Sequence, residues 1–225
     1  MSQLYIIIPA YNEQGMLNEV IKNIRQVTAA HIIVVDDGSR DPLYVDQDFK
    51  SVNLLRHYVN LGQGAALATG IQYALQLGAD MVVTFDADGQ HDPKDIAAIT
   101  EPVKSDQADI VFGSRFMGTK NQVPVLKRIL IAMARTFHWL LTGYRMTDAH
   151  NGLRAMNRKA ATVIRITENR MAHATEILFE IKRHKLRWKE VPVNIVYTPY
   201  SQKKGQSPAN SIRIFFDVVL HKLFR

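Results

Sequence analysis

The feature that most constrains the fold is the alternation of short apolar runs with helical patterns along the first half of the chain. The apolar runs, rich in β-branched residues, are Leu4–Ile8, His31–Val35, Val52–Tyr58, Met81–Phe85 and Asp109–Phe112. Short continuous apolar runs are typical of strands that are buried on both faces of a parallel sheet. Helical patterns separate them at Met16–Val27, Gly64–Leu77 and Lys94–Val103. This alternation predicts an α/β fold, with a Rossmann-like, mostly parallel sheet flanked by helices.

The second half of the chain has a different pattern. We expect helices at Val125–Thr142, Asn157–Ile166, Ala174–Arg183 and Asn210–Phe224, and strands at Gly152–Met156 and Leu186–Tyr197. No linker separates the halves, so we expect one domain over residues 1–225. It would contain a ligand-binding lobe (1–115) and a second lobe (116–225) that ends in an amphipathic helix.

Charge divides the chain in the same way. Of the 225 residues, 1–112 contain 7 Lys and Arg against 15 Asp and Glu, a net charge of −8, whereas 113–225 contain 21 against 6, a net charge of +15. A basic half favours an anionic partner such as a phosphorylated substrate, a phospholipid or a nucleic acid. A solvated basic surface is the alternative. The sequence has no basic stripe interleaved with aromatics and no known nucleic-acid module, so we expect no nucleic-acid partner.

Composition excludes several classes of protein. The chain has no Cys, which excludes disulfide scaffolds, thiol nucleophiles and Cys-based zinc sites. No stretch approaches the roughly 18 consecutive apolar residues of a membrane-spanning helix. The apolar run at the N-terminus has no basic residues before it and ends at Pro9, so we predict no signal peptide and a cytoplasmic protein.

The strongest local motif is Asp86-Ala87-Asp88-Gly89-Gln90, which directly follows an expected strand. Carboxylates at Asp86 and Asp88, with the amide oxygen of Gln90, can converge on one hard divalent cation. Oxygen ligands of this kind favour Mg²⁺ or Mn²⁺, which commonly bridge one or two carboxylates and substrate phosphates. A turn rich in Asp and Gly is the alternative interpretation.

Three further motifs follow expected strands. Asp36 and Asp37 could accept hydrogen bonds from a nucleobase or a ribose. Tyr11 offers a ring for stacking on a base, and Glu13 could bind a ribose hydroxyl. Glycines around Gly64 permit close approach of a ligand, and the helix beginning there is expected to offer unpaired N–H groups to an anion. Each motif alone is also compatible with an ordinary turn or helix cap.

Taken together, these motifs resemble glycosyltransferase family 2. The matching segments, which agree in order and spacing over residues 4–156, are Ile8–Glu13, Val35–Ser39, Asn60–Gly70, Asp86–Pro93 and Gly113–Arg115. Within the family, the Asp-Ala-Asp-x-Gln-His and Gly-Ser-Arg segments are most similar to the dolichyl-phosphate and polyprenyl-phosphate sugar synthases. The resemblance implies a GT-A fold, a nucleotide-diphospho-sugar donor carrying UDP or GDP, a polyprenyl phosphate acceptor and inverting transfer.

The resemblance also implies roles for individual residues. The donor site would comprise Pro9, Tyr11, Glu13, Asp36, Asp37, Gly64, Asp86, Ala87 and Asp88. The metal, Mg²⁺ or Mn²⁺, would be bound by Asp86, Asp88 and Gln90. The acceptor phosphate would be bound by Arg115, Arg128, Lys203 and Lys204. Catalysis would depend on Asp88, Arg115 and Asp148. In two departures, Gln63 stands where the family often has Lys or Arg, and Ala132 near where the mannosyl branch has a small hydroxyl; the donor sugar therefore stays open.

The acceptor decides whether a base is needed. A phosphate oxygen is already anionic near neutral pH, so it needs only positioning and charge compensation. A sugar or protein hydroxyl would need a general base, for which Asp148 is the candidate; its alternative role is a structural contact with Arg154. A non-catalytic nucleotide-sugar-binding protein is the third possibility, and the complete set Asp86, Asp88 and Gln90 argues against it.

Two amphipathic patterns bear on a membrane. Between Val125 and Leu141, an apolar face opposes a face with Arg128, Arg135 and Trp139, as in helices at a lipid interface or beside a phosphate site. Residues 210–224 carry an apolar stripe flanked by basic residues. Either helix could instead pack on the protein core. We expect a peripheral protein at the inner face of the cytoplasmic membrane, held by lipid or by a small membrane-protein partner.

Overall fold

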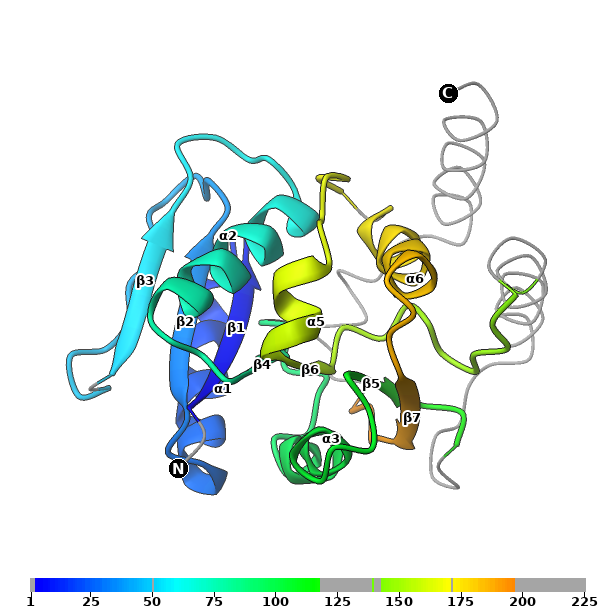
Figure 1. The fold of residues 1–225 in the computed structure, drawn as a ribbon. Helices are drawn as coiled ribbons and strands as arrows, with labels where there is room; N and C mark the ends of the chain where they lie inside the picture. Colours follow the sequence, from blue (N-terminus) through cyan, green and yellow to red (C-terminus); the bar gives the residue numbers. More distant parts are fainter. Residues whose placement is uncertain (1–2, 50, 118–138, 140–142, 171, 197–225) are drawn as a thin grey trace.

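A computed structural model describes residues 3–49, 51–117, 139, 143–170 and 172–196 (Figure 1). Its seven strands are β1 (Leu4–Ala10), β2 (His31–Asp36), β3 (Val52–Arg56), β4 (Met81–Thr84), β5 (Ile110–Ser114), β6 (Arg154–Asn157) and β7 (Trp188–Pro192). Its helices are α1 (Gln14–Val27), α2 (Gln63–Gln76), α3 (Asp95–Lys104), α5 (Arg158–Val163) and α6 (His173–Arg183).

All seven strands form one sheet in the order β3-β2-β1-β4-β6-β5-β7. The pairs β1–β2, β1–β4, β2–β3 and β5–β7 are parallel, and only β6 runs antiparallel to its neighbours β4 and β5. The predicted α/β fold with a mostly parallel sheet is therefore confirmed. Insertion of β6 between β4 and β5 places Arg154 opposite Thr84 on one side and Phe112 on the other.

The core lies on both faces of the sheet, which explains the continuous apolar runs. On one face, Ile6 and Ile8 of β1 pack with apolar residues of α1 and α3. On the other face, Ile7 packs with residues of α2, α5 and α6. Successive β1 side chains thus enter opposite layers, as the two-residue period of a strand requires. Helices cover both faces of the sheet in Figure 1.

Four strands end at the same edge of the sheet. Because β1, β2, β4 and β5 point in one direction, the residues that follow them gather at their carboxyl ends. Ligands of open α/β sheets bind at that edge. The candidate residues Tyr11, Asp37, Asp86 and Arg115 all follow these strands.

Some expected elements are shorter or lie outside the described residues. The strand expected over Leu186–Tyr197 is limited to β7, and beyond it Ile195 forms an isolated bridge with His91. The helices expected at Val125–Thr142 and Asn210–Phe224 lie outside the described residues, apart from Trp139. So do three predicted phosphate ligands: Arg128, Lys203 and Lys204. No helix in the described ranges is long and apolar enough to cross a membrane.

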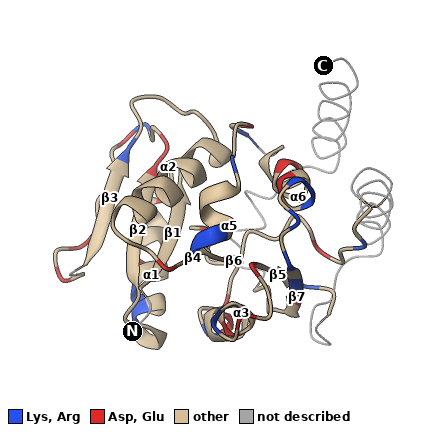
Figure 2. Ribbon diagram, in the orientation of Figure 1, with Lys and Arg blue, Asp and Glu red and all other residues tan. Residues whose placement is uncertain are grey.

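Some basic residues of the described second half lie on α5, α6 and β7, and others lie on β6 and in loops (Figure 2). Lys159 of α5 and Arg183 of α6 keep 61% and 71% of their side-chain surface exposed. Part of the positive charge is therefore solvated surface.

Asp109, directly before β5, holds neighbouring strands of this half of the sheet together. Its side chain is 1% exposed and accepts hydrogen bonds from Arg187 N (2.9 Å), Arg187 Nη2 (3.0 Å) and Asn157 Nδ2 (3.0 Å). Burial alone would raise the pKa of Asp109, but the hydrogen bonds from Arg187 and Asn157 hold it well below its usual value. The ionised carboxylate therefore stabilises the junction of β5, β6 and β7.

We expect Asp109→Asn to lower the free energy of unfolding at neutral pH by about 1–3 kcal/mol, because buried donors lose a charged acceptor. Since the folded pKa is depressed, this contribution is present above the unfolded pKa of about 3.9 and is lost as the pH falls further. Urea unfolding of both proteins at pH 7 and pH 3 measures the difference. If the difference in the free energy of unfolding is as large at pH 3 as at pH 7, the ionised Asp109 carboxylate is not its source.

Candidate active site

The loop after β1 is tied to the loop after β2. Asn12 has a positive φ of 55°; its N–H donates to Ser39 Oγ (2.8 Å), and its Oδ1 accepts from Arg40 N (3.0 Å). Tyr11 beside it is 45% exposed, so its ring is available to a planar ligand. Glu13 begins α1, and its charge acts on Asp88. Glu13 thus lies near residues 86–91, which we call the acidic loop, and Tyr11 lies at the same edge of the sheet.

Asp36 and Asp37 lie inside the fold rather than at its surface, with 1% and 3% exposed. The Asp36 carboxylate accepts from Ser39 N (2.9 Å) and Leu43 N (3.2 Å) and lies 3.5 Å from Arg56 Nε. It therefore shapes the loop that follows β2.

Asp37 organises the next loop, between β3 and α2. Its carboxylate accepts from Leu61 N (3.0 Å) and Gly62 N (2.7 Å), and its Oδ1 lies 2.8 Å from His57 Nδ1. Because protein groups already surround both aspartates, they can form the walls of a ligand site without contacting the ligand. Direct contact of Asp36, Asp37 or the buried Pro9 with a nucleoside stays a prediction.

The start of α2 corrects one expectation. Gly64 N and Ala65 N both donate to the carbonyl oxygen of Asn169, at 2.8 and 3.3 Å. A Cβ on Gly64 would lie 2.1 Å from the carbonyl oxygen of Glu168. The expectation that these amides are unpaired and available to an anion is therefore wrong. The glycine instead permits close approach of a backbone segment that is about a hundred residues away in sequence, which no local pattern indicates.

Asp86 is held from two sides at the end of β4. Its Oδ1 accepts from Gln63 Nε2 (2.9 Å), and its Oδ2 lies 3.1 Å from His91 Nε2. Burial acts to raise the pKa of Asp86, but the hydrogen bond and charge of His91, with the charge of Arg154, lower it overall. Asp86 is thus an ionised carboxylate in a fixed orientation. Sequence reasoning singled out Gln63 but missed this contact.

Asp88 has the opposite electrostatic character. Burial and the charge of Asp86 raise its pKa, and both its oxygens accept from Gln90, at 3.0 Å from the backbone N and 2.7 Å from Nε2. Two partly buried carboxylates that repel each other suit a divalent cation, whose charge relieves the repulsion. In the part of the chain that the structure describes, no three His, Cys, Asp or Glu side chains form a metal site. A pair of carboxylates such as Asp86 and Asp88 fits a cation that takes its other ligands from a diphosphate; Gln90 as a ligand stays a prediction.

Gly152 lies directly against the Asp86 carboxylate. A Cβ at this position would be 2.0 Å from Asp86 Oδ2. The carbonyl oxygen of Gly152 accepts from Thr84 Oγ1 at 2.6 Å, which fixes the approach. We expect Gly152→Ala to displace Asp86 and lower activity on the order of a hundredfold, the usual scale for a misplaced catalytic group.

The control for this substitution is Gly15→Ala, because a Cβ on Gly15 meets nothing within 4 Å. Activity and circular dichroism of both variants check the expectation. Wild-type activity in a folded Gly152→Ala variant would contradict it.

Arg115 and Asp148 form a buried ion pair beyond β5. Asp148 is 5% exposed, and its Oδ2 accepts from Arg115 Nε (2.6 Å), Arg115 N (3.1 Å) and Asn151 Nδ2 (3.3 Å). Asp148 N donates to Glu190 Oε1 at 2.8 Å. The structural contact of Asp148 is thus with Arg115 and not, as expected, with Arg154, for which only a charge interaction is seen. Asp148 fixes the guanidinium of Arg115.

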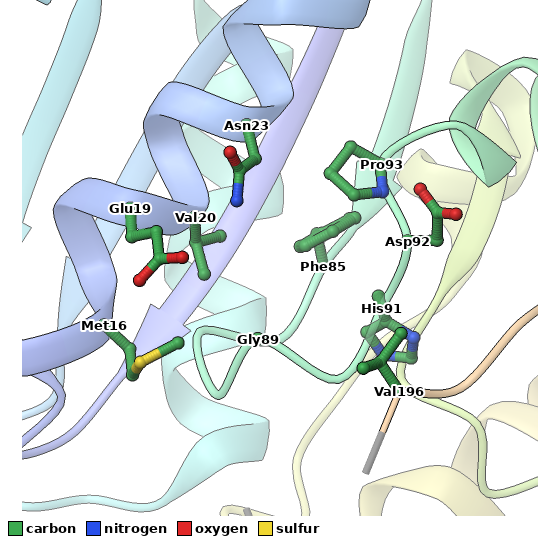
Figure 3. A pocket seen from close by; sticks show the side chains of 10 residues that line it. All are labelled: Met16, Glu19, Val20, Asn23, Phe85, Gly89, His91, Asp92, Pro93 and Val196. Atoms are coloured by element: carbon green, nitrogen blue, oxygen red, sulfur yellow. The ribbon is translucent and has the colours of Figure 1, made fainter. Parts of the chain in front are cut away.

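A cavity of about 270 Å³ lies on the α1 side of the acidic loop. Figure 3 shows Met16, Glu19, Val20 and Asn23 of α1 facing residues 85–93 and Val196. It shares Gly89 and His91 with the acidic loop, but none of the predicted donor or acceptor residues in the described ranges line it. We assign it no substrate.

The family model of glycosyl transferase family 2 matches residues 5–165. The chain belongs to glycosyltransferase family 2. It is therefore a glycosyltransferase, as the motifs indicated. The match covers the β1 to α5 region, including the sheet edge where Asp86, Asp88 and Arg115 lie.

Relatives refine this assignment. The chain is 35% identical to the UDP-N-acetylglucosamine–dolichyl-phosphate N-acetylglucosaminyltransferase of Methanococcus voltae, over 98% of this chain and 96% of that protein. It is 32% identical to the polyprenol monophosphomannose synthase of Mycolicibacterium smegmatis, over 68% of this chain and 61% of that protein. The resemblance to the polyprenyl-phosphate sugar synthases is thus confirmed.

The fold has a counterpart among solved structures. Glucosyl-3-phosphoglycerate synthase of Mycobacterium tuberculosis, crystallised with Mn²⁺, UDP-glucose and phosphoglyceric acid, aligns with a TM-score of 0.68 at 16% identity. The alignment covers 89% of this chain and 74% of that one. It confirms the predicted GT-A fold.

Proposed function

We propose that this glycosyltransferase moves one sugar, with inversion, from a UDP- or GDP-sugar to a polyprenyl phosphate in a metal-dependent reaction. One observation carries the proposal: the segment from Asp148 to Gly152 touches both halves of the site. Gly152 packs on Asp86 of the acidic loop, and Asp148 binds Arg115. A carboxylate pair suited to a metal–diphosphate is thereby fixed relative to a guanidinium suited to a phosphate. The names of the relatives support both ligands.

On the donor side, the chain supplies binding and orientation. Tyr11 is exposed for stacking on the base, and Glu13 lies beside the acidic loop for a ribose hydroxyl. Asp86 and Asp88 would bind Mg²⁺ or Mn²⁺, which neutralises charge on a departing nucleoside diphosphate when bound. Gln63 and His91 keep the Asp86 carboxylate in place.

On the acceptor side, the geometry favours a phosphate over a hydroxyl. Asp148 Oδ2 accepts two hydrogen bonds from Arg115 and one from Asn151, so this carboxylate is engaged in orienting Arg115. A phosphate oxygen needs no base, since it is already anionic. Arg115 would orient it and compensate its charge. Arg128, Lys203 and Lys204 are proposed as further phosphate ligands from sequence alone.

A lipid acceptor places the reaction at a membrane. We propose peripheral association with the inner face of the cytoplasmic membrane, through lipid or through a small membrane protein. Flotation with liposomes, with and without anionic lipid, tests the lipid version. Recovery of the protein only in the bottom fraction, under both conditions, would count against it.

The deciding experiment is transfer of labelled sugar from a panel of UDP- and GDP-sugars into an organic-extractable lipid. The reaction contains the purified protein, polyprenyl phosphate and Mg²⁺ or Mn²⁺, with EDTA as the control. Labelled lipid that disappears with EDTA would establish donor, acceptor and metal requirement together. If native membranes are added and no donor labels the lipid, the polyprenyl phosphate acceptor is wrong.

A further inference from the structure

Arg154 is a buried cation in the middle of the sheet. Its side chain is 1% exposed and is the largest of the fully buried side chains in the described part of the chain. It lies on β6, opposite Thr84 of β4 and Phe112 of β5. An arginine in the centre of a sheet is costly unless its charge is balanced, because burial removes its hydration.

The guanidinium makes few hydrogen bonds for a group with five N–H donors. Nη2 donates to the carbonyl oxygen of Ala149 at a long 3.4 Å, and the group lies 5.7 Å from the Phe112 ring centroid. Nε and Nη1 find no hydrogen-bond partner among the described residues. Hydrogen bonds therefore do not explain why an arginine is buried at this position. Its positive charge is the property that needs an explanation.

That charge lies between the two halves of the site: Arg154 pairs with Thr84, two residues before Asp86, and its Nη2 donates to the carbonyl oxygen of Ala149, next to Asp148. The charges of Asp86 and Asp148 both stabilise the Arg154 cation, against burial, which lowers its pKa to about 10. Arg154 thus stays charged at neutral pH. Burial and the charge of Arg154 lower the pKa of His173 to about 4, so this neighbouring histidine is neutral and adds no cation. Arg154 is the permanent positive charge behind the acidic loop.

A fixed cation has a direct consequence for metal binding. Arg154 compensates Asp86, so the carboxylate pair attracts a free divalent cation less than two uncompensated carboxylates would. An anionic diphosphate arriving with the metal reverses this balance, because the same guanidinium attracts the anion. The electrostatics therefore favour the metal–diphosphate complex over the metal alone.

We propose that Arg154 is a positioning residue that makes divalent-cation binding at Asp86 and Asp88 depend on a nucleoside diphosphate, while it stabilises the Asp148 carboxylate that binds Arg115. Donor and acceptor halves thus share one internal counter-charge. The inference rests on the proposed donor role of Asp86 and Asp88. The inference gives Arg154 an electrostatic role, although its position in an apolar strand would not indicate one.

The test measures Mn²⁺ binding, not sugar transfer. Electron paramagnetic resonance of free Mn²⁺ gives the affinity with and without UDP or GDP at constant ionic strength. Removing the charge in Arg154→Met should tighten binding of Mn²⁺ alone by about tenfold, the order expected for loss of one nearby unit charge at an effective dielectric constant of about 20. The factor by which UDP or GDP increases the Mn²⁺ affinity should be smaller in this variant than in the wild type. Arg154→Lys keeps a positive charge, so its Mn²⁺ affinity should stay closer to that of the wild type.

The matched control is Arg183→Met, which removes the same group from an arginine with 71% of its side chain exposed at the end of α6. A merely structural role predicts weaker Mn²⁺ binding in Arg154→Met; weaker or unchanged binding in a folded variant would overturn the proposal. Wild type provides a second test if that variant does not fold: equal Mn²⁺ affinity with and without nucleotide would also overturn it. The Mn²⁺-binding measurement contains no acceptor. Its result can therefore be interpreted even if the lipid-transfer assay fails.

Discussion

Asp88→Asn is expected to reduce sugar transfer on the order of a hundredfold or more, the scale for loss of one preorganised contact that stabilises developing charge. The variant keeps the size of the side chain and an oxygen that can accept from Gln90, but loses the negative charge. Asp86 would then be the only carboxylate of the pair. The reduction should be strongest at low metal concentration, because a neutral amide is a weaker ligand of a divalent cation.

The same substitution is expected to leave the fold as stable as wild type, or more stable. Burial and the charge of Asp86 raise the pKa of Asp88 in the folded protein. A raised carboxyl pKa means that the ionised form is disfavoured by folding, so this group costs stability once the pH exceeds its unfolded value. A neutral asparagine removes that cost. Activity and stability should therefore change in opposite directions, as at sites where function conflicts with stability.

Transfer rates at several Mn²⁺ concentrations and thermal unfolding at pH 7 check both halves of this prediction. Asp92→Asn, in the turn before α3, is the control because it makes the same chemical change outside the carboxylate pair. A variant that loses activity and also unfolds at a lower temperature would assign Asp88 a structural role. Unchanged transfer would remove it from the donor site.

The fold was predictable because its signals are local. Continuous apolar runs such as Leu4–Ile8 mark strands covered on both faces, and helical patterns of ten or more residues separate them. The element order follows from these patterns. The sheet order does not: β6 inserts antiparallel between β4 and β5, and nothing in the four residues Arg154–Asn157 encodes that position.

The sequence predicts where the candidate site lies in the fold, but not the contacts within it. The Asp86–Asp88 spacing and the strand before it indicate a carboxylate pair at a sheet edge. In contrast, Gln63 binds Asp86 from 23 positions away, and Asn169 blocks the amide of Gly64. Contacts of this kind depend on how the layers pack. The one local signal that could have revealed the counter-charge was Arg154 itself, a charged residue inside an apolar strand pattern.

Removal of the Arg115 guanidinium is the second large effect that we expect. Arg115→Met should lower kcat/KM for polyprenyl phosphate on the order of a hundredfold, since an anionic acceptor loses a charge-assisted partner. The KM for the nucleotide-sugar should change little, because the donor residues follow other strands. Initial rates with each substrate varied in turn separate these two parameters.

Asp148→Asn should have a smaller effect, about 10-fold, as expected when a residue that orients a functional group is removed. Its Oδ2 holds the Arg115 side chain at 2.6 Å, and an asparagine oxygen would hold it less firmly. Loss of this buried charged pair should also lower the free energy of unfolding by about 1.5–3 kcal/mol. Thermal unfolding is therefore measured together with the kinetics. Activities are then compared at a temperature at which the wild type, Arg115→Met and Asp148→Asn are all folded.

The double variant distinguishes the two possible acceptors. If Asp148 acts only through Arg115, the double variant should resemble Arg115→Met, because two residues that act as one unit are not additive. If Asp148 is instead a general base for a hydroxyl acceptor, Asp148→Asn alone should cause the larger loss, and the double variant should fall further. The pH profile of kcat/KM for the acceptor adds an independent readout: loss of its acidic limb in Asp148→Asn would indicate a base. A phosphate acceptor predicts that the limb stays, since the ionisation belongs to the substrate and not to this carboxylate.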